Sequence, residues 1–178
     1  MPDNENKNLT TTGYLFDIAE LYEIYLEKLL SRNFPEWSVS GQVEISIYKQ
    51  KFYSRSLFPD LVMTHRATEK VIVLDAKFKK MGMQNNDIDR SDLHQIHSYS
   101  GYYQNNLIAS GLIYPLSRQL DIDKSYSDTL YGKNNNDVLF IVDGIYVYET
   151  QTMDDLIENE NIFIKRMTDF IGKQDVTI

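Results

Sequence analysis

The sequence predicts an α/β protein in which helices flank a mixed central sheet. Apolar residues recur at helical spacing near both ends of the chain, and short runs rich in Val and Ile lie between them. The expected order is helix, three strands, helix and strand (αβββαβ), followed by a C-terminal strand and helix. We expect a flexible tail over 1–13 and one domain over 14–178, which is an ordinary domain size.

Three stretches have the three- and four-residue apolar spacing of amphipathic helices. They span 14–30, about 92–105 and 154–171. Pro35 follows the first stretch and is a stop signal. Ser91 or Asp92 is expected to cap the second helix after a polar loop.

Strands are expected where apolar residues alternate with polar ones or form short continuous runs. They span 41–48, 57–65, 70–78, 111–116 and 137–149. The first three are expected to form an antiparallel meander, with "RATE" at 66–69 as a turn. The stretch 137–149 is either one long strand or a hairpin turning at Asp143–Gly144, and the polar stretch 123–136 before it is expected to be a loop.

The composition excludes several classes of protein. The chain contains no cysteine, which excludes disulfides, thiolate zinc sites and cysteine nucleophiles and fits a reducing cytoplasm. No apolar run approaches the ~18 residues that would span a bilayer. The polar, acidic N-terminus does not resemble a signal peptide.

The charge is distributed unevenly along the chain. The net charge of −8 argues against a free-standing nucleic-acid binder, yet residues 49–80 hold eight Lys or Arg against three carboxylates, a net charge of +5. Solvated lysines at strand edges would explain this segment without any function. Contacts to DNA phosphates would also explain it. The candidate phosphate contacts are Lys49, Lys51, Arg55, Lys79 and Lys80.

Two carboxylates are expected to meet at the hairpin between the second and third strands. A turn centred between Ala67 and Thr68 places Asp60 opposite Asp75, with Cβ atoms ~4.5–5.5 Å apart. Such a pair is tolerated if a cation lies between the two groups or if one is protonated. Lys77 shares the face of Asp75, because side chains alternate along a strand.

This arrangement points to metal chemistry. Mg²⁺ is bound by one or two carboxylates together with waters, and Mn²⁺ is a possible substitute. A nearby lysine can help to activate water or balance charge on a phosphorane-like transition state. The physical interpretation is hydrolysis of a phosphodiester by metal-activated water.

The same residues resemble the signature of PD-(D/E)XK nucleases. "FPDLV" contains Pro59–Asp60, and "DAK" supplies Asp75, Ala76 and Lys77. "LYEIYLEKLL" and "HQIHSY" supply the helix glutamate and the Q-x-x-x-Y pattern that members and a subset of members carry. Over about residues 14–116 the combination is similar to the nuclease domain of McrC, the cleavage subunit of McrBC modification-dependent restriction systems.

The resemblance implies a role for each matching residue. Asp60, Asp75 and the Ala76 carbonyl would bind the metal ion, and Lys77 would orient or activate the attacking water. Glu23 would complete the metal site, in competition with Glu20 and Glu27 one turn to either side. Gln95 and Tyr99 would brace the site or touch the DNA backbone. His94 and His97 stand three residues apart, but no third metal ligand is evident.

The resemblance also implies partners. We expect a Mg²⁺-dependent endonuclease that cleaves double-stranded DNA, with recognition of modified cytosine on a separate AAA+ GTPase. McrC proteins carry an N-terminal region that engages this partner, whereas only about 13 polar residues precede the first expected helix; the chain is either a fragment or a shorter relative. The alternatives are a RecB-like QxxxY nuclease of repair or recombination and a non-catalytic module that binds a partner.

Overall fold

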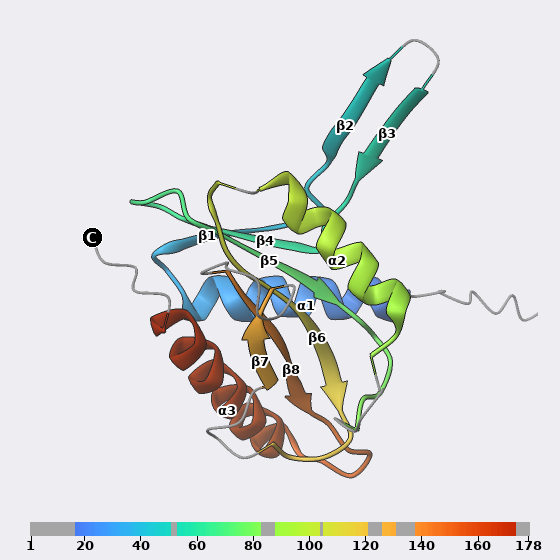
Figure 1. Cartoon of the computed structure of the whole chain (residues 1–178). Helices are drawn as coiled ribbons and strands as arrows, with labels where there is room; N and C mark the ends of the chain where they lie inside the picture. Colours follow the sequence, from blue (N-terminus) through green and yellow to red (C-terminus); the bar gives the residue numbers. More distant parts are fainter. Residues whose placement is uncertain are drawn as a thin grey trace, which may run out of the picture.

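The computed structural model describes residues 17–50, 53–82, 88–103, 105–120, 126–130 and 138–173. This part of the chain forms three helices and eight strands, which confirms the predicted α/β class (Figure 1). The elements are α1 (Ile18–Asn33), β1 (Trp37–Gly41), β2 (Ile45–Gln50), β3 (Tyr53–Leu57), β4 (Leu61–His65), β5 (Val71–Ala76), α2 (Arg90–Tyr102), β6 (Leu107–Leu116), β7 (Tyr126–Thr129), β8 (Leu139–Tyr146) and α3 (Met153–Gly172).

The central sheet is mixed, as predicted. Its strand order is β1-β4-β5-β6-β8-β7. The pairs β1–β4, β4–β5 and β7–β8 are antiparallel, whereas β5–β6 and β6–β8 are parallel. Helix α2 makes the crossover between the parallel strands β5 and β6, as a parallel connection requires.

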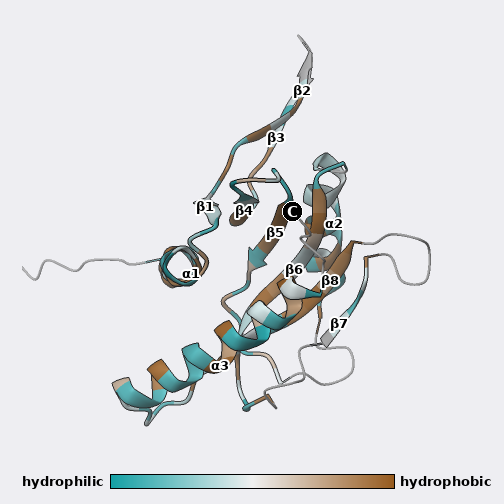
Figure 2. Ribbon diagram, turned by 90° about the vertical axis from the view of Figure 1, so that its left-hand side faces the viewer, coloured by the Kyte–Doolittle hydropathy of each residue, from teal (hydrophilic) through white to brown (hydrophobic). Residues whose placement is uncertain are grey.

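Helices cover both faces of this sheet. Helices α1 and α3 pack on one face around Leu26, Phe163 and Leu74, and α2 packs on the other around Ile96 and Val73. Figure 1 shows α2 crossing in front of the strands with α1 behind them, and Figure 2 shows the same layers from the side. Strands β5 and β6 are buried at every position, which is why both read as continuous apolar runs.

Capping side chains mark where the outer helices begin. The Asp17 carboxylate accepts a hydrogen bond from the Ala19 N–H at 2.9 Å, and Thr152 forms a capping box with Asp155. The predicted helices 14–30 and 154–171 are therefore confirmed with shifted ends, except that residues 14–16 lie outside the described part. The N-cap position of α2 is Asp89, whose side chain makes no capping hydrogen bond, so the prediction of Ser91 or Asp92 as the N-cap is wrong.

The predicted strand over 41–48 is wrong in its pairing. The outer strand of the meander is β1, and the chain turns away at Gln42, whose φ of 46° no strand adopts. The Ile45–Gln50 stretch pairs with Tyr53–Leu57 in a separate two-stranded sheet that projects from the body (Figure 1). The alternation of apolar residues is real, but it serves a local hairpin rather than the central sheet.

Of the predictions that follow α2, one is wrong, one alternative is confirmed and one strand is longer than expected. The expected polar loop at 123–136 contains the edge strand β7, which pairs with Leu139–Val142 of β8. Strand β8 runs through Asp143–Gly144 without a turn, so the single-strand alternative holds. Gly144 is required by packing, because a Cβ there would lie 1.7 Å from the carbonyl oxygen of Tyr114 on β6. The expected strand 111–116 extends back to Leu107.

The hairpin between β4 and β5 has the predicted register. Leu61 pairs with Leu74 and Val62 pairs with Val73, and the His65 N–H closes the turn on the carbonyl oxygen of Lys70 at 2.8 Å. The predicted tail at 1–13 lies outside the described residues. No helix in the described part of the chain has the length and apolar character needed to cross a bilayer.

A buried ion pair joins α3 to the sheet, and we expect it to dominate stability there. Arg166 donates through Nε and Nη2 to the Asp143 carboxylate at 2.8–3.0 Å, and both side chains are buried. Arg166→Met should lower the free energy of unfolding by about 3–5 kcal/mol, because it leaves the Asp143 charge buried and unpaired. Urea denaturation followed by circular dichroism measures this change.

Lys165→Met is the matched control, since Lys165 is exposed on the same helix. Its replacement should leave the urea concentration at the midpoint of unfolding nearly unchanged. Equal midpoints for the two variants would show that the ion pair does not hold α3.

Candidate active site

The β4–β5 register brings Asp60 and Asp75 together. Asp60 precedes the first paired residue of β4, and Asp75 follows its partner on β5. The main-chain N–H of Ala76 donates a hydrogen bond of 2.8 Å to Oδ2 of Asp60. The two carboxyl groups therefore lie side by side where the hairpin leaves the core.

Both carboxyl groups lie on the face of the sheet that α2 covers. Val62 and Val73, each two residues away along its strand, pack in the core beneath α2, whereas Ala76 packs in the core beneath α1. Asp75 is fully buried, and Asp60 is half-buried. A one-residue slip of either strand would have separated the two groups, so the register is what creates the site.

The Asp75 carboxylate lacks the hydrogen bonds that a buried charge normally has. Nζ of Lys77 lies 2.5 Å from its Oδ2. Neither carboxylate oxygen of Asp75 accepts a hydrogen bond of normal geometry from any residue in the described part of the chain. The contact with Lys77 is therefore an ion pair only. Buried polar groups are nearly always satisfied, and an exception calls for an explanation such as a missing ion.

The two carboxyl groups perturb each other. Burial, and after it the charge of Asp75, raises the pKa of Asp60 to about 7. Burial also raises the pKa of Asp75, although the adjacent Lys77 ammonium group and, after it, the Asp60 carboxyl group act in the opposite direction. In the absence of a cation, the pair therefore favours holding a proton well above the pH at which a solvent-exposed aspartate releases it.

Lys77 lies at the start of a chain of polar contacts that leads to α2. Its Nζ donates to Oε1 of Gln95 at 2.8 Å, and Nε2 of Gln95 donates to the hydroxyl oxygen of Tyr99 at 2.6 Å. Burial lowers the pKa of Lys77, but contact with Asp75 outweighs burial and raises it. The lysine is thus a fixed cation at neutral pH rather than a base. Tyr99 is buried, which suits a bracing role better than contact with DNA.

Glu23 approaches the site from the opposite layer. It lies half-buried on α1 and accepts a hydrogen bond of 3.0 Å from Nε2 of Gln42. Burial, opposed by this hydrogen bond, raises the pKa of Glu23, and the charge of Asp60 adds to the increase. Glu20 is exposed, and the Glu27 carboxylate lies against Gly41, so Glu23 is the most suitable of the three.

The geometry fits a divalent cation bound mainly by two carboxylates. Within the described ranges, no group of three or more His, Asp or Glu side chains is close enough to form a complete cage. Asp60 and Asp75 nevertheless offer paired oxygens, two of them buried without hydrogen bonds. Mg²⁺ commonly binds to one or two carboxylates and takes its other ligands from water and substrate, so two suffice. His94 and His97 join no metal-binding group in the described part.

The predicted DNA contacts differ in how the structure places them. Lys79 forms ion pairs with Asp89 and with Asp92, the latter at 2.7 Å, so it is already engaged. Lys80 and Arg55 are exposed. The side chain of Lys49 and the whole of Lys51 lie outside the described residues.

Asp92 is a site residue that the sequence analysis treated only as a cap. It is buried, pairs with Lys79 and accepts a hydrogen bond of 2.9 Å from the hydroxyl group of Tyr114 on β6. Its charge also contributes to the raised pKa of Asp75. Asp92, Gln95 and Tyr99 are separated by three and then four residues, which places all three on one face of α2. This spacing is the feature of the sequence that could have predicted a site role for Asp92.

Comparisons with known proteins agree with the observed fold. In a search of solved structures, the chain matches McrC in a complex with McrB AAA+ hexamers from Thermococcus gammatolerans, with a TM-score of 0.61 and 19% sequence identity. The match covers 89% of this chain but only 34% of that McrC chain, and at this identity it supports the fold alone. No curated protein shows significant similarity to the chain.

A family model gives the firmer assignment. It describes a component of the McrBC 5-methylcytosine restriction system and matches residues 1–115 of the 178 in the chain. The matched region includes Glu23, both aspartates, Lys77 and the polar contacts of α2. The chain therefore belongs to the family of McrBC 5-methylcytosine restriction system components.

Proposed function

We propose that this protein is a Mg²⁺-dependent endonuclease of the PD-(D/E)XK type that cuts double-stranded DNA. One observation carries the proposal: a fully buried Asp75 without normal hydrogen bonds lies beside Asp60 and in an ion pair with Lys77. A purely structural carboxylate at this depth would have its hydrogen bonds satisfied. The order α1, β1, β4, β5, α2, β6 supports the expected αβββαβ core, with the β2–β3 hairpin inserted.

Each residue has a distinct role in this mechanism. Asp60 and Asp75 would hold the cation with the Ala76 carbonyl as a further ligand, and Glu23 would complete the site through a water. A divalent cation bound there supplies positive charge that acidifies water and neutralises the scissile phosphate. Lys77 stays protonated, so it would orient the attacking water through a hydrogen bond and stabilise negative charge that develops on the phosphate. Gln95 and Tyr99 hold the Lys77 ammonium group in place.

Family membership supports a role as the cleavage subunit of a modified-cytosine-dependent restriction system in the cytoplasm. The structural neighbour is McrC in a complex with McrB AAA+ hexamers, and we infer that this chain likewise works with an AAA+ GTPase subunit. The net charge of −8 fits a nuclease that its partner holds on DNA. The chain spans about a third of the length of that McrC.

Asp75→Asn should abolish DNA cleavage while the fold persists. The substitution removes a cation ligand, and we expect the cleavage rate on methylated DNA with the AAA+ partner to fall about a thousandfold or more. The melting temperature should stay equal or rise, because a buried charge is lost. Asp169→Asn, at an exposed position on α3, is the control and should cleave normally. Full activity of a folded Asp75→Asn protein would contradict the assignment.

The carboxylate pair should make cation binding depend on pH. Because the pKa of Asp60 is raised to about 7, the folded protein holds protons that the unfolded chain releases near pH ~4. Without metal, stability from this pair is therefore lost as the pH rises from about 4 to 7. Mn²⁺ should raise the melting temperature more at pH 8 than at pH 6, as differential scanning fluorimetry would measure.

Asp60→Asn tests the origin of this effect. The variant should lose both the response to Mn²⁺ and its pH dependence, whereas a response that survives the substitution would place the cation elsewhere.

Gln95→Leu should slow cleavage without weakening DNA binding. The variant frees the Lys77 ammonium group from its tether, and we expect kcat to fall about 10- to 100-fold with little change in Kd for DNA. Single-turnover kinetics with separate binding measurements distinguishes the two effects. His94→Leu, at an exposed position of the same helix, is the control. A parallel loss of binding and cleavage would mean that Gln95 contacts DNA directly.

A further inference from the structure

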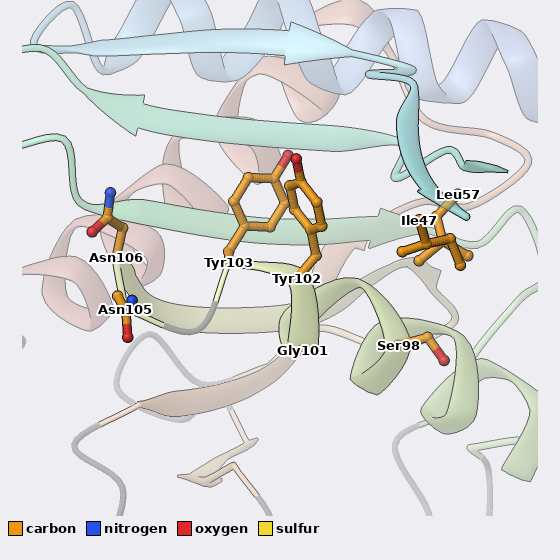
Figure 3. Close-up of a pocket in the computed structure, with 8 residues that line it drawn as sticks. All are labelled: Ile47, Leu57, Ser98, Gly101, Tyr102, Tyr103, Asn105 and Asn106. Atoms are coloured by element: carbon orange, nitrogen blue, oxygen red, sulfur yellow. The ribbon is translucent and has the colours of Figure 1, made fainter. Parts of the chain in front are cut away.

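A groove separates the projecting hairpin from helix α2. It has a volume of about 740 Å³. Ile47 and Leu57 of the hairpin lie at one end, Asn105 and Asn106 lie at the other, and Tyr102 and Tyr103 lie between them (Figure 3). The two tyrosine rings stand next to each other, with centroids 5.1 Å apart and planes at 85°. The carboxylate pair does not line this groove.

Both walls of the groove nevertheless contain residues that lie close in the chain to residues of the candidate active site. On the helix side, Tyr102 and Tyr103 follow Tyr99 by about one turn, and Tyr99 contacts the Gln95 that holds Lys77. On the hairpin side, Leu57 lies three residues before Asp60 in the chain. Leu57 and Tyr103 also pack against the core that contains Tyr99. A long ligand bound at the site would therefore extend into the groove.

The lining of the groove suits a nucleic-acid backbone. It contains hydroxyl and amide groups and no carboxylate. Tyr, Ser and Asn side chains are common donors to phosphate oxygens, and they contact DNA without reading its sequence. Ile47 on the hairpin is 40% exposed and Tyr102 on α2 is 54% exposed, so both walls of the groove present apolar surface to solvent. Such surface can pack against deoxyribose.

The hairpin also carries the appropriate charge. Residues 44–57 contain Lys49, Lys51 and Arg55 against one carboxylate, Glu44, which accepts a hydrogen bond of 2.8 Å from Ser56 of β3; the segment has a net charge of +2 in a chain whose net charge is −8. A positive projection on an acidic protein attracts phosphate and repels the acidic surface of another copy of this chain. The charge therefore favours DNA over self-association as the occupant.

We propose that the groove between the β2–β3 hairpin and α2 binds the backbone of double-stranded DNA flanking the phosphodiester to be cut. The site would then have two parts, the carboxylate pair for chemistry and the groove for holding the flanking duplex. This proposal rests on the proposed nuclease function and adds the surface that binds the substrate outside the catalytic centre.

DNA affinity measured without cleavage tests the proposal. The full chain in EDTA is titrated onto a fluorescein-labelled duplex of about 30 base pairs at about 50 mM salt, and anisotropy gives Kd. Tyr102→Ala and Ile47→Asp should each weaken binding about tenfold, because one loses a contact and the other places negative charge beside phosphate. Ile157→Asp is the matched control, since Ile157 is 46% exposed on α3, and it should bind within about twofold of the unmodified protein.

Three outcomes would overturn the proposal. They are equal affinity for groove and control variants, no DNA binding by the unmodified chain, and loss of AAA+ partner binding by groove variants that keep their DNA affinity. The last outcome would assign the groove to a protein interface. Melting temperatures confirm that each variant is folded. Failure of the nuclease function is a separate result, because it requires that the unmodified chain with Mg²⁺ and partner leaves DNA uncut.

Discussion

The antiparallel pairing of β4 with β5 is the constraint on which the rest of the site depends. Leu61 and Leu74 are paired and fully buried beneath α1, while Val62 and Val73 are paired and buried beneath α2. Burial on both faces fixes the register, because a one-residue slip would exchange the residues that face the two cores. This register leaves Asp75 beside Asp60 at the end of the ladder. The apolar half of the hairpin thus sets the geometry of its charged half.

Two buried aspartates of this protein illustrate the difference between a structural carboxylate and the carboxylate that we propose to be functional. Asp143 and Asp75 are both fully buried, and burial raises the pKa of each. Asp143 accepts three hydrogen bonds from the Arg166 guanidinium group and one from the Gly144 N–H, so its charge is matched. Asp75 has one lysine and a like-charged neighbour. Its poorly matched charge would destabilise the metal-free fold, and the cation that we propose would offset that cost.

The two ends of α2 contact different parts of the protein. The N-terminal half carries Asp92 and Gln95, which link Lys79, Tyr114 and Lys77 to one another through the helix. The C-terminal end presents tyrosines and asparagines to the groove opposite the hairpin. One rigid helix therefore fixes the distance between the candidate catalytic centre and the surface that we propose holds the DNA.

The sequence by itself determined the helices, the β4–β5 hairpin and the pairing of Asp60 with Asp75, because these follow from periodicity and from contacts close in the chain. Tertiary structure alone decided what depends on distant partners. Strand β1 joined the sheet in place of 41–48, and polar β7 became an edge strand, because free edges were available for pairing. The contacts of Asp92 and the groove emerged only when α2 packed against β5 and β6, opposite the hairpin. Periodicity reports which face of an element is buried, but not what lies against it.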